Sequence, residues 1–272
     1  DLTKILIRFR LNPVAIVTDI EKAFLHVGLH EQDRDVTRFL WLDNPVDPQS
    51  DLATYRFKSV LFGATCSPFI LNAVLLKHLQ QTENETTKIL TRDLYVDNIL
   101  SSICNETQAV TYFKEARQLM LNAGFNLRSW TSNNENVRNL AIKEDVLDTE
   151  KEAKILGMRW NVETDELSYA KRVLPSVSSN ITKREILKES SKLFDPLGFL
   201  SPVSIRAKIL MQDLWKERYD WDEPLPENLQ LQWKDLAKDI GIVTSMKLPR
   251  QYFTGNTNSR SLHVFVDASM KA

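Results

Sequence analysis

The chain has 272 residues, of which 43% are hydrophobic and 26% are charged, and its formal net charge is −1. This length allows one large domain or two ordinary ones with an ample core, and the near-neutral charge means that a nucleic-acid partner would need a local basic face. Two cysteines exclude a disulfide framework and favour a reducing compartment. No apolar run approaches the roughly 20 residues that cross a bilayer, so no membrane partner is expected. The first residues lack a signal-peptide pattern and do not begin with Met, so we expect a piece of a longer, non-secreted protein.

Short apolar runs alternate with helical patterns up to about residue 170, which predicts a mixed α+β region. The strands expected in chain order are 14–19, 37–42, 54–60, 125–130, 153–160 and 166–169. Turn-forming residues at 43–48 predict that the second and third strands form a hairpin, and the last two strands should form another. Residues 131–149 are predicted to be a polar loop.

Two helices are predicted within this region. The first should open with Ser67 as its cap and Pro68 in its first turn. Its predicted apolar stripe is Phe69, Ala73, Leu76 and Leu79. The second should run over 106–122 and end at Gly124, because apolar residues recur there at helical spacing.

The stretch 88–102 surrounds one acid, Asp97, with apolar and β-branched residues. This composition predicts two short strands joined by a tight turn, with Asp97 and Asn98 at the bend. A carboxylate at such a tip can bind a metal ion but needs a second carboxylate to do so well. The best candidate is Asp19, which ends the strand 14–19; the alternative for Asp19 alone is a cap at the entry of a helix.

The rest of the chain, from about residue 176, is mainly helical in pattern. Thr182 and Glu185 form a capping box that should open a helix reaching residue 194. Further helices are expected at 201–218, capped by Ser201, and at 227–240. A final strand is expected at 262–267.

Six short motifs follow one another along the chain. They are VTDIEKAF at 17–24, LFGATCSPF at 61–69 and YVDN at 95–98, followed by FNLRSW at 125–130, ILGMRW at 155–160 and FDPLGFLSP at 194–202. The first three resemble, in order and spacing, the palm of a reverse transcriptase. The later three look like the polymerase of BEL/Pao-type LTR retrotransposons, and the likeness covers nearly the whole chain.

The resemblance implies a fold, a reaction and a set of site residues. The fold would be a palm with partial fingers at 1–170, with a mixed, mainly antiparallel sheet, then a helical thumb or connection region at 171–255 and the start of an RNase H-like domain at 256–272. The reaction would be RNA-directed DNA synthesis with two Mg²⁺ or Mn²⁺ ions.

The implied catalytic residues are Asp19, Asp97 and Asn98, with Ile20 adding a backbone carbonyl to the two aspartates as metal ligands. The implied substrate-binding residues are Phe24, Phe62, Gly63, Tyr95 and Arg128, and the implied primer grip is Leu156, Gly157 and Met158.

Some of these roles have a plainer structural alternative. Phe24 matches the ring that lies under the incoming sugar and excludes a 2′-hydroxyl, but it could be a core residue. Gly63 could mark a strand-to-helix turn, and Gly157 a bulge in a strand. Asn98 departs from the family, which usually has a second Asp there. The loss of that charge would leave the enzyme impaired or, if the acid is an essential ligand, inactive.

The stretch 171–216 holds nine basic residues against four acids. The resemblance places this excess on the thumb, where it would contact the phosphate backbone of primer and template in a salt-sensitive manner. The residues expected to do so are Lys183, Arg184, Lys188 and Arg206. The alternative for any single one is solvated helix surface.

Asp267, after the last predicted strand, resembles the first metal ligand of an RNase H domain, whose partner acids would follow residue 272. The implied partners are an RNA or DNA template with primer, deoxynucleoside triphosphates and the rest of a Pol polyprotein with RNase H and integrase. The implied location is the cytoplasmic virus-like particle, with the nucleus as a second place. Two competing interpretations are a catalytically silent nucleic-acid-binding remnant of the same fold and, far less favoured, an aspartic peptidase built on Asp267-Ala-Ser.

Overall fold

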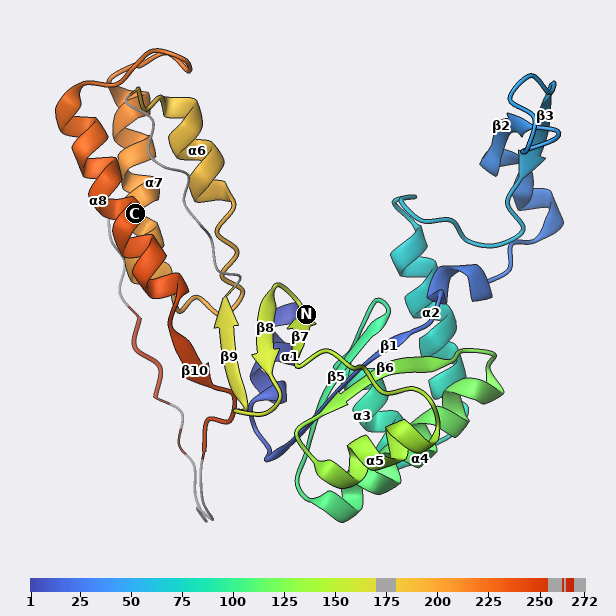
Figure 1. The fold of residues 1–272 in the computed structure, drawn as a ribbon. Helices are drawn as coiled ribbons and strands as arrows, with labels where there is room; N and C mark the ends of the chain where they lie inside the picture. Colours follow the sequence, from blue (N-terminus) through green and yellow to red (C-terminus); the bar gives the residue numbers. More distant parts are fainter. Residues whose placement is uncertain (170–179, 254–260, 262, 267–272) are drawn as a thin grey trace. The chain divides into compact units, whose positions relative to one another are not determined.

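The structure is a computed structural model that describes residues 1–169, 180–253, 261 and 263–266 (Figure 1). The chain divides into two compact units. The central unit is Pro13–Thr149, and the flanking unit joins Asp1–Asn12 to Glu150–Ala272. The mixed α+β composition agrees with the prediction. None of the described helices combines the length and apolar character needed to cross a membrane.

The central unit is built on a four-stranded antiparallel sheet of order β4-β5-β1-β6. The strands are β1 (Val14–Ile20), β4 (Leu94–Tyr95), β5 (Asn98–Ile103) and β6 (Leu127–Ser132). The sheet packs against α3 (Glu85–Asp93), α4 (Glu106–Asn122) and α5 (Glu135–Lys143), which lie along one side of it in Figure 1. The inner strand β1 is buried over its first five residues, four of which are apolar.

The helix at 106–122 has the predicted bounds. Its buried side chains are Ala109, Tyr112, Phe113, Ala116 and Met120. Gly124 follows it with φ of 78°, the left-handed conformation that a helix C-terminus favours.

Two predictions near this helix were wrong. Residues 88–93 are not a strand but belong to α3, which the Asn84 side chain opens through a capping box with Thr87. The polar loop predicted at 131–149 contains α5, capped by Asn134. In both cases an asparagine cap starts the helix, and α5 also carries Val137, Leu140 and Ala141 at helical spacing on its packed side, a pattern that the prediction missed.

The other elements of the central unit are η1 (Ala23–His26), η2 (Glu31–Thr37), β2 (Arg38–Leu42), β3 (Leu52–Arg56) and α2 (Ser67–Leu79). The predicted hairpin is confirmed, since β2 pairs with β3. Ser67 does not cap α2: it is the first helical residue, Cys66 is the N-cap, and the Ser67 hydroxyl donates to the Leu61 carbonyl at 2.7 Å. The predicted stripe was also wrong except at its end, because Phe69 is exposed and the buried residues are Leu71, Leu75 and Leu79.

The flanking unit contains a second antiparallel sheet, of order β10-β9-β8-β7. Its strands are β7 (Glu152–Ile155), β8 (Met158–Asn161), β9 (Glu166–Tyr169) and β10 (Lys247–Pro249). The second predicted hairpin is therefore a three-stranded meander to which β10 adds from about 80 residues further along the chain.

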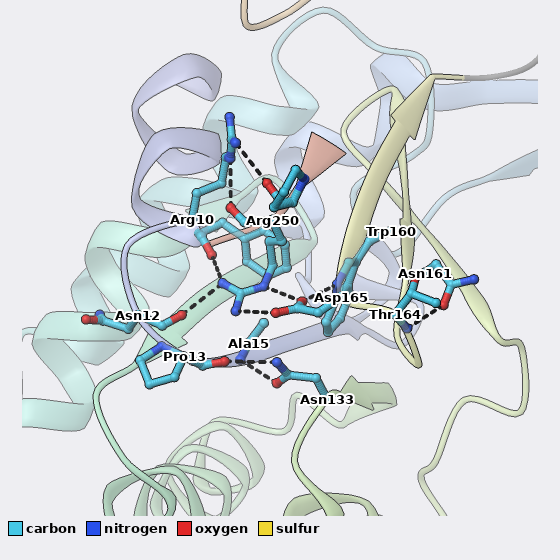
Figure 2. Close-up of polar contacts among 12 residues, drawn as sticks. Arg10, Asn12, Pro13, Ala15, Asn133, Trp160, Asn161, Thr164, Asp165 and Arg250 are labelled. Carbon is cyan, nitrogen blue, oxygen red and sulfur yellow. Dashed lines mark hydrogen bonds and ion pairs between the residues drawn. The ribbon is translucent and has the colours of Figure 1, made fainter. Parts of the chain in front are cut away.

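Arg250, directly after β10, is fully buried and joins two distant segments of this unit to β10 (Figure 2). It donates twice to the Asp165 carboxylate, at 2.6 and 2.9 Å, and to the carbonyls of Phe9 and Asn12, at 2.7 and 2.9 Å. The Trp160 indole donates to the same carboxylate at 2.9 Å. This network fixes the end of α1 (Leu2–Phe9) to the β8–β9 connection.

Three helices complete the flanking unit: α6 (Lys183–Ser191), α7 (Ser201–Lys216) and α8 (Glu227–Thr244). They share an apolar cluster that includes Ile186, Leu210 and Trp233. The capping box of Thr182 and Glu185 is confirmed. Ser201 is not a cap, since Leu200 holds that position. Residues 263–266 are not in a strand, contrary to prediction, and Asp267 lies outside the described residues.

Candidate active site

The register of the central sheet aligns three polar residues on neighbouring strands. Asp19 of β1 pairs with Asn98 of β5 on one side and with Arg128 of β6 on the other. Paired residues in a sheet point to the same face, so these side chains form one row. The sequence-predicted residues Asp19, Asn98 and Arg128 are thus brought together by backbone pairing.

Asp97 stands next to this row in the β4–β5 turn. The Asp97 carbonyl accepts a hydrogen bond from the Ile20 amide at 2.8 Å. Opposed Cα atoms lie about 4.5–5.5 Å apart and consecutive ones 3.8 Å apart, so the Cα atoms of Asp19 and Asp97 lie within about 9 Å. The convergence expected of these two aspartates is therefore met by the backbone.

The turn differs from the prediction by one residue. Tyr95 pairs with Asn98, so Val96 and Asp97 form the bend and Asn98 begins β5. Val96 has φ of 58°, a conformation that β-branched residues rarely adopt. Such strain costs on the order of 1–3 kcal/mol and is concentrated at functional sites.

The two aspartates differ in how their oxygens are bonded. The Asn98 amide donates to Oδ1 of Asp97 at 2.8 Å. Oδ1 of Asp19, by contrast, is buried without a hydrogen-bond partner. A buried polar atom left open costs about 1–3 kcal/mol and calls for an explanation such as an absent ion.

Arg128 is held at the edge of the row by Glu21, which the sequence analysis missed. Nη1 of Arg128 donates to one Glu21 oxygen at 2.8 Å, and the Asn126 amide donates to the other at 2.9 Å. These hydrogen bonds, from Asn126 first and Arg128 second, lower the pKa of Glu21, and Glu21 raises the pKa of Arg128. The signal was available, since Glu21 follows Asp19 at strand spacing.

A β-bulge in β6 sets the position of Arg128. The register shifts between Val17 and Asp19, where β6 contributes an extra residue. Ser129 has φ of 51° at this place, as a bulge residue often does. Thr18 anchors the strand by donating its hydroxyl to the Arg128 carbonyl at 2.6 Å.

Phe24, Phe62 and Gly63 also belong to the central unit. The ring centroids of Phe24 and Phe62 lie 5.1 Å apart in an edge-to-face arrangement, which is a favourable aromatic geometry. Phe24 is buried, whereas Phe62 is exposed. Gly63 has φ of 84°, so both the turn and the close-approach interpretations of this glycine stand. The structure brings the two rings together, and Tyr95 faces Asn98 across the turn.

The donor set can be compared with the needs of a divalent ion. No group of three or more His, Cys, Asp or Glu side chains within the described residues is placed to hold a metal. Two carboxylates remain, those of Asp97 and of Asp19 with its open buried oxygen, and hard oxygen donors of this kind suit Mg²⁺ or Mn²⁺. Asn98 occupies the place where a third acid would stand, so the site fits such an ion with one charge fewer.

The predicted primer-grip residues lie in the flanking unit, at the turn between β7 and β8. Leu156 and Gly157 have φ of 46° and 91°, and positive values at both central positions are typical of a type I′ hairpin turn. Ile155 and Met158 close the turn as a strand pair. Gly157 is therefore a turn residue and not a bulge.

The four predicted phosphate-contacting residues differ in access. Lys183 is buried: its ammonium donates to the Tyr219 carbonyl at 3.2 Å and lies 3.6 Å from the Trp215 ring centroid. A phosphate contact by Lys183 does not fit this position, so that prediction is corrected. The exposed side chains of Arg184 and Arg206 form ion pairs with acids of the same unit, and Lys188 is exposed.

Comparison with known families agrees with this geometry. Residues 4–159, more than half of the chain, match the reverse transcriptase (RNA-dependent DNA polymerase) family, and the chain belongs to that family. Residues 182–272 match the family described as the Pao retrotransposon-like RNaseH-like domain. Together the two matches support a fragment of a BEL/Pao-type reverse transcriptase. A search of curated proteins gives no match.

Proposed function

We propose that the central unit carries the polymerase centre for template-directed DNA synthesis on an RNA or DNA template, with a primer and deoxynucleoside triphosphates. The observation that supports this best is the register that sets Asp19 opposite Asn98, with Asp97 adjacent and one buried Asp19 oxygen open. Family membership supplies the type of reaction. The palm, thumb and RNase H division at residues 170 and 255, and assembly with the rest of a Pol polyprotein in a cytoplasmic particle, remain part of the proposal.

Asp19 and Asp97, with the Ile20 carbonyl, would hold the divalent ions. When bound, two such ions stabilise the attacking and leaving oxygens of an in-line displacement at a phosphate. Asn98 fixes the Asp97 carboxylate through its amide hydrogen bond. Glu21 keeps the Arg128 guanidinium at the end of the row, where it can neutralise charge on the leaving group.

The remaining residues position the substrates. The rigid ring of Phe24, supported by Phe62, would lie under the sugar and exclude a 2′-hydroxyl. Gly63 and Tyr95 would contact the nascent base pair and the template. In the flanking unit, the exposed residues Arg184, Lys188 and Arg206 would contact phosphates. Leu156, Gly157 and Met158 would contact the primer end.

One observation favours a second candidate, a catalytically silent nucleic-acid-binding remnant. Asn98 leaves two acids where the family usually has three, and no three-acid group occurs in the described part of the chain. If a third charge is essential for binding both ions, nucleic acid would bind without turnover. The two candidates share a fold and differ only in chemistry.

Primer extension with Mg²⁺ and with Mn²⁺ separates them. We expect extension by the unaltered chain, abolition by Asp97→Ala and a gain by Asn98→Asp, which restores the third acid. Glu135→Ala, an exposed acid on α5, is the matched control and should change nothing. Primer–template binding without extension in both the unaltered chain and Asn98→Asp would establish the remnant instead.

A further inference from the structure

The connection between α6 and α7 lies against the β7–β8 turn of the flanking unit. A Cβ atom placed on Gly157 would lie only 2.3 and 2.4 Å from Cδ1 and Cε1 of Phe194. The Phe194 ring therefore occupies the space beside the turn that a side chain at position 157 would need. Because Gly157 also has φ of 91°, both the backbone conformation and the contact require glycine there.

The next residue, Asp195, ties the same connection to the same sheet. Its carboxylate accepts a hydrogen bond from the Tyr169 hydroxyl at 2.9 Å. Tyr169 is paired with Met158, the residue that closes the turn. Asp195 also accepts from the amides of Phe199 and Leu200, at 3.1 and 2.6 Å, which closes the connection into a compact loop.

The far side of this 194–200 loop is anchored on α1. The Thr3 hydroxyl donates to the Pro196 carbonyl at 3.4 Å. The guanidinium of Arg10 lies 5.2 Å from the centroid of the Phe199 ring, within the range of a cation–π contact. The loop is thus fixed independently of the turn that it touches, as a support must be.

We propose that Phe194 and Asp195 are positioning residues that hold the Leu156–Gly157 turn in the conformation that contacts the primer end. This inference rests on the proposed function, since it assigns the turn to primer contact. Phe194 keeps 51% of its surface exposed, so the ring is only half buried. Its main effect is to exclude other positions of the turn.

The role also explains two features of the motif at 194–202. Aspartate at 195 is needed as an acceptor for three donors at once, which an apolar residue could not replace. The aromatic ring at 194 reaches the Gly157 backbone with its Cδ1–Cε1 edge, so it fills the space that a side chain at 157 would need. The motif is accordingly a support for the turn and not a separate binding site.

The test is a double-mutant cycle of Phe194→Ala and Gly157→Ala in the full chain. Ile186→Ala, which truncates a buried residue of the three-helix cluster, is the control for general destabilisation of the flanking unit. Each variant is measured for the KM of primer–template, for kcat, for melting temperature and for hydrogen exchange of the amides at 156–158. The probe is a DNA primer annealed to an RNA template.

Phe194→Ala should raise the KM of primer–template by about tenfold, leave kcat within about twofold and speed exchange at 156–158 by about tenfold. Ile186→Ala should lower the melting temperature but leave the KM of primer–template, kcat and exchange at 156–158 unchanged. Gly157→Ala should raise the KM of primer–template several-fold more in the native background than in the Phe194→Ala background. The reason is that removing the ring also removes the clash with the new methyl group.

Additive effects in the cycle, or equal effects of Phe194→Ala and Ile186→Ala at equal loss of melting temperature, would overturn the proposal. If the unaltered chain neither binds nor extends the primer, the proposed function fails and takes the primer-contact role with it. The exchange rates and the stability cycle then still decide whether Phe194 restrains the turn.

Discussion

Asp165 in the flanking unit and Asp19 in the central unit both lie at strand boundaries, but their carboxylates have opposite surroundings. Asp165 is bonded on both oxygens, by Arg250 and by the Trp160 indole. Asp19 keeps one buried oxygen without a partner. An unsatisfied buried acceptor reduces stability. The first arrangement therefore stabilises the fold, whereas the second is consistent with the metal-binding role proposed for Asp19.

The largest expected effect is the loss of activity on substitution of Asp19. Asp19→Asn should reduce primer extension by at least about 10³-fold, because the ligand charge that supports several kcal/mol of transition-state stabilisation is lost. The free energy of unfolding should change by less than about 1 kcal/mol, since no hydrogen bond to Oδ1 is removed. Single-turnover extension and urea denaturation measure the two quantities. A large loss of stability with activity retained would show that Asp19 is structural.

Substitution of Arg250 should instead cause a large loss of stability. Arg250→Met leaves the Asp165 carboxylate without its main partner and two carbonyls without donors. Breaking a buried pair in this way costs about 3–5 kcal/mol of unfolding free energy. Denaturation combined with hydrogen exchange should place the loss in residues 1–12, 158–169 and 247–252.

Arg128→Met is the matched control in the central unit. Its ion pair with Glu21 is largely exposed, so it should cost less than about 1 kcal/mol while lowering activity. If Arg250→Met were no more destabilising than Arg128→Met, the flanking network would not be the main support of its unit.

One buried tyrosine in each unit gives a smaller, pH-dependent comparison. Burial raises the pKa of Tyr112 in α4, and burial together with the Asp195 carboxylate raises the pKa of Tyr169. A raised pKa means that the folded state holds the proton more tightly. The stabilisation is therefore complete below the ordinary tyrosine pKa of about 10 and is lost as the pH rises above it.

Tyr112→Phe and Tyr169→Phe should each flatten the alkaline decline of stability by up to about 1.4 kcal/mol per pH unit. At pH 7 each should cost about 1 kcal/mol for its lost hydrogen bond, to Ser101 and Asp195 respectively. Unfolding curves recorded from pH 8 to about pH 11 would show this. If the unfolding free energy of the native and variant chains fell in parallel with rising pH, the two tyrosines would not be the cause of the alkaline decline.

Much of this organisation could be predicted from local signals. The helix at 106–122 and the capping box at 182–185 depend on spacing within one segment, and both were predicted correctly. Asp19 and Asp97 could be paired from their places at strand ends together with the motif order. The helix α5 could also have been predicted, since Asn134 caps it and its buried residues Val137 and Ala141 lie four residues apart.

What could not be predicted depends on contacts between distant segments. Lys183 reads as a surface cation, yet its neighbours Trp215 and Tyr219 follow more than 30 residues later and bury it. The same holds for Arg250, whose partners lie about 85 and 240 residues away. Charge alone does not show whether a side chain will meet solvent, phosphate or an aromatic ring.

The corrected assignment of Lys183 gives the smallest and most specific prediction. Lys188→Met should reduce the slope of log binding constant against log salt by about 0.7–0.9, as the loss of one phosphate contact requires. Lys183→Met should leave that slope unchanged, because the Lys183 ammonium is committed to the Tyr219 carbonyl and the Trp215 ring. Fluorescence anisotropy with a labelled primer–template between about 50 and 200 mM salt measures both slopes. An equal change for the two variants would mean that the buried lysine is released when nucleic acid binds, and that charge in the flanking unit can change from a folding role to a binding role.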